Sequence, residues 1–208
     1  MTSLRFFFWF LLISFSASAQ KDYKLWLQYH KIQNTAIASE YKSNLQGIVS
    51  LGSSETSKIS VTELETGISD MLGNKPEVKS VINGENNLIV GAQTTLNSDL
   101  QKIFQSDFTQ INNEGFIIKS VLLKNKKQII ITGKNDVAVL YGVYSFLRLM
   151  QTNKSIKSIN IIDAPKTNIR ILNHWDNLDR TVERGYAGFC LWNWQKLPDF
   201  IDQRYIDY

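Results

Sequence analysis

The pattern of hydrophobic and polar positions predicts an alternation of short strands and helices over most of the chain. Apolar, β-branched runs bounded by glycine or polar turns are typical of buried strands. Such runs predict strands at residues 45–51, 87–92, 115–123, 128–132 and 156–162. Residues 22–29 alternate apolar and polar side chains, which favours an edge strand or an N-terminal arm. A short polar turn separates the runs 115–123 and 128–132, so we expect these two strands to form a hairpin.

Two segments have the spacing of amphipathic helices. In residues 57–72 the apolar side chains recur every three or four positions, and Gly73 follows as a helix stop. The second helix is predicted at residues 137–150, with Asn135 or Asp136 as its N-cap. Its predicted buried face consists of Val137, Leu140, Tyr141, Tyr144 and Leu147. Together these elements predict one compact α/β unit over residues 20–165, ended by Pro165.

The first nineteen residues have the organisation of a secretory signal peptide. Arg5 precedes an apolar run over residues 6–15, and Ala17-Ser18-Ala19 offers a small-residue cleavage site. A membrane anchor is the alternative, but this run is shorter than the roughly 20 residues that span a bilayer. We therefore expect cleavage before Gln20, no membrane segment afterwards, and a periplasmic or extracellular location.

Composition narrows the classes of function further. The net charge is +4, and no run of basic residues is interleaved with aromatic ones, so no nucleic-acid partner is expected. Cys190 is the single cysteine, which excludes an internal disulfide framework. Its apolar surroundings favour a small packed hydrophobe over a nucleophile. The chain has no glycine-rich phosphate loop, no metal-ligand spacing and no serine elbow, so neither a metal nor a cofactor is predicted.

Ile169, Ile171 and Leu172 predict a short apolar strand that leads into the most polar stretch of the chain. Its chemistry-bearing side chains are His174, Trp175, Asp176, Asn177, Asp179, Arg180, Glu183 and Arg184. An indole offers an apolar plate to a sugar ring, while carboxylate, amide and guanidinium groups bind hydroxyls. Equally, the same residues can form a self-satisfied network that only holds a loop, with Asp176 capping backbone and Arg184 paired to Glu183 or Asp179.

Several motifs carry a resemblance to a known family. They are His174–Asp179 (HWDNLD), Glu183–Gly188 (ERGYAG), Tyr23–Leu27 (YKLWL), Asp136–Leu149 (DVAVLYGVYSFLRL), Leu197–Asp199 (LPD) and Arg204–Tyr208 (RYIDY). The chain thereby resembles glycoside hydrolase family 67, the α-glucuronidases. The resemblance implies a sandwich-like α/β accessory domain of the hexosaminidase type at residues 20–165. The first βα unit of a truncated (β/α)8 catalytic barrel would follow at residues 166–208.

The resemblance also implies an activity. Such an enzyme is an inverting exo-hydrolase that releases (4-O-methyl)-glucuronic acid from xylo-oligosaccharides without a cofactor. Its catalytic carboxylates are expected beyond Tyr208, so we expect an N-terminal fragment that is inactive alone. The residues carried over as substrate-binding are Trp175, Asp176, Asn177, Glu183, Arg184 and Trp192. Whether the full-length protein forms a homodimer is left open.

Two other interpretations remain. The chain is either a non-catalytic carbohydrate-binding or accessory module, or the N-terminal part of another glycosidase with the same accessory domain. β-Hexosaminidases, for example, carry similar N-terminal domains.

Overall fold

The computed structural model describes residues 24, 27–171, 173, 177–182 and 188–207. The predicted signal peptide, residues 1–19, lies outside this described part. The chain divides into two compact units. One unit is Tyr29–Asn173, and the other comprises Met1–Gln28 and His174–Tyr208.

A six-stranded mixed sheet forms the centre of the unit Tyr29–Asn173, in the order β2-β1-β3-β5-β4-β6. Its strands are β1 (Gly47–Ser50), β2 (Glu77–Lys79), β3 (Asn87–Ala92), β4 (Phe116–Leu123), β5 (Lys126–Gly133) and β6 (Asn160–Asp163). The strands β2, β1, β3 and β5 are parallel, whereas β4 is antiparallel to both β5 and β6. The sheet and its helices confirm the predicted α/β class.

The predicted hairpin is formed by β4 and β5. The register pairs Leu123 with Lys126, so Lys124 and Asn125 alone make the loop. Both have positive φ, +50° and +60°. Two left-handed central residues define a type I′ turn, whose twist matches that of the flanking strands. The turn therefore holds Lys124 and Lys126 at one end of the sheet.

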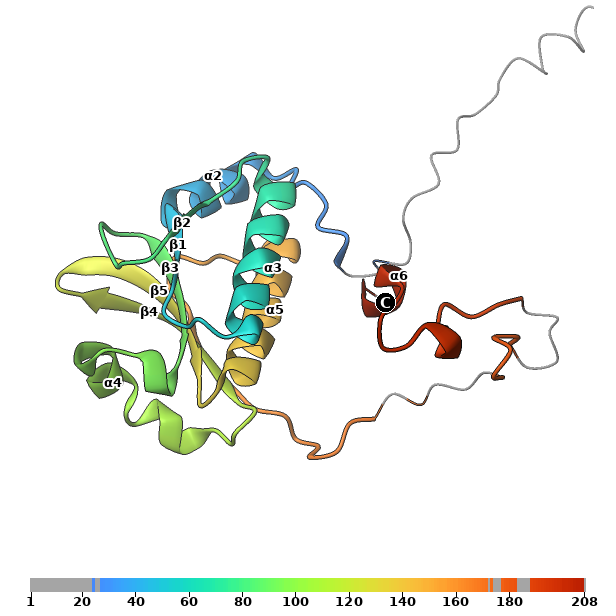
Figure 1. Ribbon diagram of the computed structural model, residues 1–208. Coiled ribbons are helices and arrows are strands. Elements are labelled where there is room, and N and C mark those ends of the chain that lie inside the picture. The colour runs from blue at the N-terminus through green and yellow to red at the C-terminus, as the bar shows by residue number, and fades with distance from the viewer. Residues whose placement is uncertain (1–23, 25–26, 172, 174–176, 183–187, 208) are drawn as a thin grey trace, which may run out of the picture. The chain divides into compact units, whose positions relative to one another are not determined.

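Two long helices, α3 (Glu55–Leu72) and α5 (Asp136–Gln151), lie side by side on one face of the sheet (Figure 1). Ser54 caps α3, and Gly73 ends it with a left-handed φ of +76°. Asn135 is the N-cap of α5, since its Oδ1 accepts the Ala138 N–H at 3.0 Å. Both predicted helices are confirmed, and the cap of the second is resolved in favour of Asn135.

The predicted buried face of α5 was wrong. Val137 is 44% exposed, and only Leu147 of the five predicted residues is fully buried. The residues that are buried are Ala138, Val139, Gly142, Val143, Phe146, Leu147 and Met150. The helix comes closest to the sheet at Gly142, where an added Cβ would lie 2.6 Å from Ile131 Cγ2. The buried face is therefore centred on Gly142, and Tyr141 and Tyr144 are only half-buried.

The opposite face of the sheet is covered by shorter helices (Figure 1). These are η2 (Gln93–Thr95), α4 (Ser98–Phe104) and η3 (Asp107–Gln110). Phe104 and Phe108 pack there against Ile89 and Ile130 of the sheet in one apolar cluster. Sequence reasoning assigned no helix here, nor α2 (Thr35–Asn44), whose buried Tyr41 donates a hydrogen bond to Lys154 O at 2.6 Å.

Two strand predictions, and the edge-strand alternative for residues 22–29, differ from the structure. The strand predicted at 156–162 is confined to Asn160–Asp163. No strand forms at the described residues of 22–29, nor at the described residues 169–171. Ile169 and Ile171 are 74% and 83% exposed. A strand needs a neighbour for its backbone groups, and no described segment pairs with 169–171.

The described residues contain no helix with both the length and the hydrophobicity needed to cross a bilayer.

Candidate functional site

A tight turn at residues 177–181 begins the described part of the polar stretch. Asn177 N–H donates to Thr181 O at 3.1 Å, and Asn177 Nδ2 donates to Thr181 Oγ1 at 2.9 Å. Asp179 Oδ1 accepts both the Thr181 N–H (2.9 Å) and the Thr181 hydroxyl (2.6 Å). These hydrogen bonds, led by that of the Thr181 hydroxyl, lower the pKa of Asp179. The Asp179 carboxylate therefore stays ionised, and it orders the turn.

A short antiparallel pairing follows the turn. Thr181 and Phe189 form a β-bridge, flanked by hydrogen bonds from Val182 N to Gly188 O (3.0 Å) and from Cys190 N to Arg180 O (2.9 Å). Arg180, with φ of +73°, also donates from Nη2 to Cys190 O at 3.0 Å. This pairing holds Arg180–Val182 beside Gly188–Cys190.

Three aromatic rings cluster beyond this pairing. The Trp192 ring lies 4.9 Å from that of Tyr205 and 5.6 Å from that of Trp194, centroid to centroid. The Trp192–Trp194 arrangement is edge-to-face, a favourable geometry for aromatic pairs. Trp192 is half-buried, whereas Trp194 is 44% exposed. Trp192 thus braces its neighbours, and Trp194 offers the more accessible ring face.

An ion pair lies in the segment that leads to Tyr205. Arg204 binds the Asp202 carboxylate with both Nε (3.0 Å) and Nη2 (2.7 Å), and its own N–H adds a third bond to Oδ1. These bonds, the side-chain ones first, lower the pKa of Asp202 to about 2. Arg180 adds a smaller electrostatic effect in the same direction. Asp202 is therefore a fixed anion and has no proton to give at neutral pH.

The six predicted substrate-binding residues divide into two groups. Trp175, Asp176, Glu183 and Arg184 lie outside the described residues, so their predicted roles stay predictions. Asn177 and Trp192 are described, and the roles predicted for them are likewise untested. The amide nitrogen of Asn177 serves the turn, as the loop-holding interpretation expects for this stretch. Cys190 is half-buried and donates from Sγ to Trp192 O at 3.2 Å.

Sequence reasoning assigned no binding role to Trp194 or Tyr205. The signal was present, because Trp192 and Trp194 are two positions apart in the Trp-Asn-Trp run, and residues two apart in extended backbone point to the same face. The helix η4 (Trp194–Lys196) follows this run, and α6 (Gln203–Asp207) carries Tyr205, whose ring contacts that of Trp192. Within the described residues, no three His, Cys, Asp or Glu side chains gather as a metal site would require.

The arrangement is suited to binding a polar ring. Aromatic faces bind the C–H side of a pyranose, and the neighbouring amides, carboxylates and guanidinium groups are typical partners of its hydroxyls. The described residues provide a rigid support for such contacts, since the turn, the bridge and the ion pair fix the backbone at 177–182, 188–190 and 202–204.

Comparison with known proteins identifies the family. The model of the glycosyl hydrolase family 67 N-terminus matches residues 25–146, and that of the family 67 middle domain matches residues 149–208. The chain is similar to proteins named probable alpha-glucuronidase A. It is 27% identical to that of Aspergillus fumigatus (strain CBS 144.89 / FGSC A1163 / CEA10) over 175 residues, which cover 83% of this chain and 20% of the relative.

Two further relatives carry the same name. The chain is 29% identical to that of Aspergillus terreus (strain NIH 2624 / FGSC A1156) over 78% of its own length and 19% of the relative's. It is 27% identical to that of Aspergillus niger over 86% and 20%. The chain thus spans about a fifth of the length of the curated relatives it matches. Because a single family supplies consecutive matches from residue 25 to residue 208, the chain belongs to glycoside hydrolase family 67.

Proposed function

We propose that this chain provides the N-terminal and first substrate-contacting part of an exported α-glucuronidase. The enzyme removes (4-O-methyl)-glucuronic acid from xylo-oligosaccharides by an inverting mechanism. The observation that carries the proposal is the succession of two family 67 matches, N-terminal and then middle domain, along one chain. The names of the relatives supply the activity.

In this proposal the segment 166–208 begins the catalytic barrel. It contributes a wall of the uronic acid subsite, through Trp175, Asp176, Asn177, Glu183 and Arg184, and Trp192 is a further candidate for the same wall. A guanidinium group binds a sugar carboxylate through two parallel hydrogen bonds, which is the role we assign to Arg184. The ordered turn at residues 177–181 and the contact between Trp192 and Tyr205 support this assignment, because both lie within this segment.

The acid and base of the reaction lie, in this proposal, in the part of the relatives' length that these 208 residues do not match. An inverting hydrolase protonates the leaving oxygen with one carboxylic acid and activates water with an opposed carboxylate. Asp179 and Asp202 are held ionised by hydrogen bonds, so neither suits the role of proton donor. We therefore expect the 208-residue chain alone to bind substrate without hydrolysing it.

The test uses xylo-oligosaccharides that carry 4-O-methyl-glucuronic acid and, as a control, unsubstituted xylo-oligosaccharides. The product of the longest reading frame containing this sequence should release the uronic acid with inverted anomeric configuration, followed by NMR. The unsubstituted control should stay intact. Cleavage of a different glycosidic bond would instead assign the chain to another glycosidase. Binding without any hydrolysis by that product would favour a carbohydrate-binding module.

A further inference from the structure

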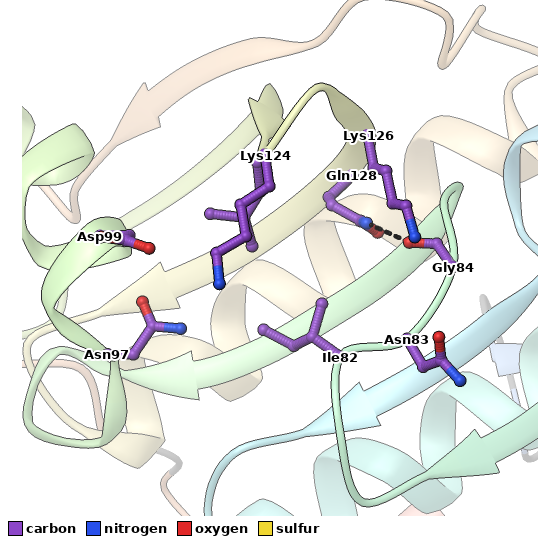
Figure 2. Close-up of a pocket in the computed structure, with 9 residues that line it drawn as sticks. Ile82, Asn83, Gly84, Asn97, Asp99, Lys124, Lys126 and Gln128 are labelled. Carbon is purple, nitrogen blue, oxygen red and sulfur yellow. Dashed lines mark hydrogen bonds between the residues drawn. The ribbon is translucent and has the colours of Figure 1, made fainter.

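A polar cavity lies in the unit Tyr29–Asn173, among residues that the proposed function does not use. It has a volume of about 250 Å³ and opens beside the β4–β5 hairpin turn (Figure 2). Three segments far apart in the sequence surround it: the loop Ile82–Gly84, the start of α4 at Asn97 and Asp99, and the hairpin residues Lys124 and Lys126.

The wall at Asn83 and Gly84 is held rigidly by two buried amide side chains. Asn87 Nδ2 donates to Asn83 O at 3.0 Å, and Gln128 Nε2 donates to Gly84 O at 2.9 Å. Gln128 Oε1 accepts in turn from the N–H and the Nδ2 of Asn87. Both Asn87 and Gln128 are almost completely buried in the sheet. The loop is therefore fixed to β3 and β5 before any ligand arrives, which lowers the entropy lost on binding.

The charges facing the cavity are arranged for an anion. Among the described residues, no hydrogen bond or ion pair involves the ammonium group of Lys124 or Lys126, whereas that of the next lysine, Lys127, donates to Asn44 Oδ1 at 2.8 Å. Figure 2 shows the ammonium group of Lys124 pointing into the space between Asn97 and Ile82. Two ammonium groups oppose one carboxylate, that of Asp99, so the cavity is net positive.

The other lining groups fit the hydroxyls and the ring of a sugar. Asn97 Oδ1 caps α4 by accepting the Leu100 N–H at 3.0 Å, which leaves its NH₂ group to donate to a ligand. The Asp99 carboxylate can accept hydrogen bonds from hydroxyl groups, which a sugar acid carries and a simple anion such as acetate lacks. Ile82 and Leu123 form an apolar floor that belongs to the core cluster. The volume is just below the roughly 300–1,000 Å³ of drug-sized sites, so one ring fits and a chain does not.

We propose that this cavity is a secondary binding site for a single acidic sugar ring, a uronate. Its carboxylate lies between Lys124 and Lys126, its hydroxyls bind Asp99 and Asn97, and its C–H face rests on Ile82. The site lies wholly in the N-terminal unit and is independent of the proposed hydrolysis. It binds the free sugar acid, or the same acid at the non-reducing end of an oligosaccharide.

The test is an NMR titration of the ¹⁵N-labelled 208-residue chain with sodium D-glucuronate. We expect backbone amide shifts at Gly84, Asn97 and Lys126, with a Kd on the order of millimolar, as is usual for a ligand of this size. D-Glucose keeps the ring without the carboxylate, and sodium acetate keeps the carboxylate without the ring. Each should bind about tenfold or more weakly, because each loses one set of charge-assisted or hydroxyl bonds.

The variants Lys124→Met and Lys126→Met should each weaken glucuronate binding about tenfold. Lys166→Met is the matched control, since Lys166 is an exposed lysine without a described partner outside the cavity, and it should bind like the wild type. An aldobiuronic acid that shifts the same amides would identify the oligosaccharide end as a source. The proposal is overturned if acetate binds as well as glucuronate, if Lys166→Met weakens binding equally, or if no amide at the cavity shifts.

Discussion

At the scale of single residues, Gln128 is a buried polar side chain on which several hydrogen bonds of the sheet depend. It is 1% exposed and satisfies three groups at once: the N–H and Nδ2 of Asn87 and the carbonyl of Gly84. Gln128→Leu keeps the volume but leaves the buried Asn87 N–H without its partner, while Asn87 Nδ2 keeps its bond to Asn83 O. An unsatisfied buried group costs about 1–3 kcal/mol, so we expect the unfolding free energy to fall by about 2 kcal/mol in equilibrium urea denaturation.

A matched glutamine substitution separates this effect from a general loss of polarity. Gln110→Leu changes an exposed residue with one long hydrogen bond, from Nε2 to Ser106 O at 3.4 Å. Its unfolding free energy should stay within about 0.5 kcal/mol of the wild type. Equal losses of unfolding free energy in the two variants would show that the buried hydrogen bonds of Gln128 do not stabilise the protein more than an exposed glutamine does.

Glu40 gives the N-terminal unit a dependence on pH. Partial burial raises the pKa of its carboxyl, but hydrogen bonds from the Ser155 hydroxyl and the Ile156 N–H, together with Lys157, outweigh burial and lower the pKa below the ordinary 4.5. A lowered folded pKa stabilises the protein above the unfolded value, and this stability is lost as pH falls through the folded pKa. Glu40→Gln should therefore destabilise the protein at pH 7, by about 1 kcal/mol.

Urea denaturation of both proteins across the acid range checks this expectation. The difference between wild type and Glu40→Gln should shrink as pH falls below 4.5. Glu85→Gln, an exposed carboxylate without a described partner, is the control and should match the wild type throughout. A difference that stays constant with pH would mean that the charge of Glu40 is not involved.

At the scale of elements, sequence patterns predicted the turns, caps and helix ends that depend on neighbouring residues. The Lys124-Asn125 turn of the hairpin, the Asn135 cap and the Gly73 stop each act within a few residues, and all were found where expected. The buried face of α5 was missed because it depends on the depth of contact with the sheet. The helices α2 and α4 were missed because weak amphipathic patterns are stabilised there by distant partners, such as Lys154 O for Tyr41.

The contact between α5 and the sheet yields a prediction in which two effects oppose each other. Replacing a helical glycine by alanine normally gains about 1 kcal/mol in helix propensity. At Gly142 the new Cβ would lie 2.6 Å from Ile131 Cγ2 and 3.3 Å from Phe116 Cβ. Overpacking costs about 1–3 kcal/mol, so we expect Gly142→Ala to lower the thermal midpoint. Ser145→Ala in the same helix has no such contact and should be neutral or slightly stabilising.

At the scale of the whole molecule, the two units differ in how much of their structure could be predicted from the sequence. The unit Tyr29–Asn173 could be predicted because its core is made of regular elements with periodic patterns. The candidate site at 174–207 could be predicted in its residue types but not in its geometry, which depends on turns and single bridges such as Thr181–Phe189. The motif resemblance identified the family, whereas the exposure of the Trp194 ring and its contact with Trp192 depend on packing that a sequence pattern does not determine.

That exposed ring gives the last prediction. Trp194 is 44% exposed and is supported edge-on by Trp192, so it is a ready platform for the apolar face of a xylose or uronic acid ring. Trp194→Ala should weaken binding of glucuronic-acid-bearing xylo-oligosaccharides about tenfold in isothermal titration calorimetry, the loss of one stacking contact. Phe189→Ala removes an even more exposed ring, 72%, outside the aromatic cluster, and should leave the affinity unchanged. Equal losses of affinity in Trp194→Ala and Phe189→Ala would mean that the binding does not depend on the position of the exposed ring. An unchanged Trp194→Ala affinity would limit the cluster to holding α6 through Tyr205.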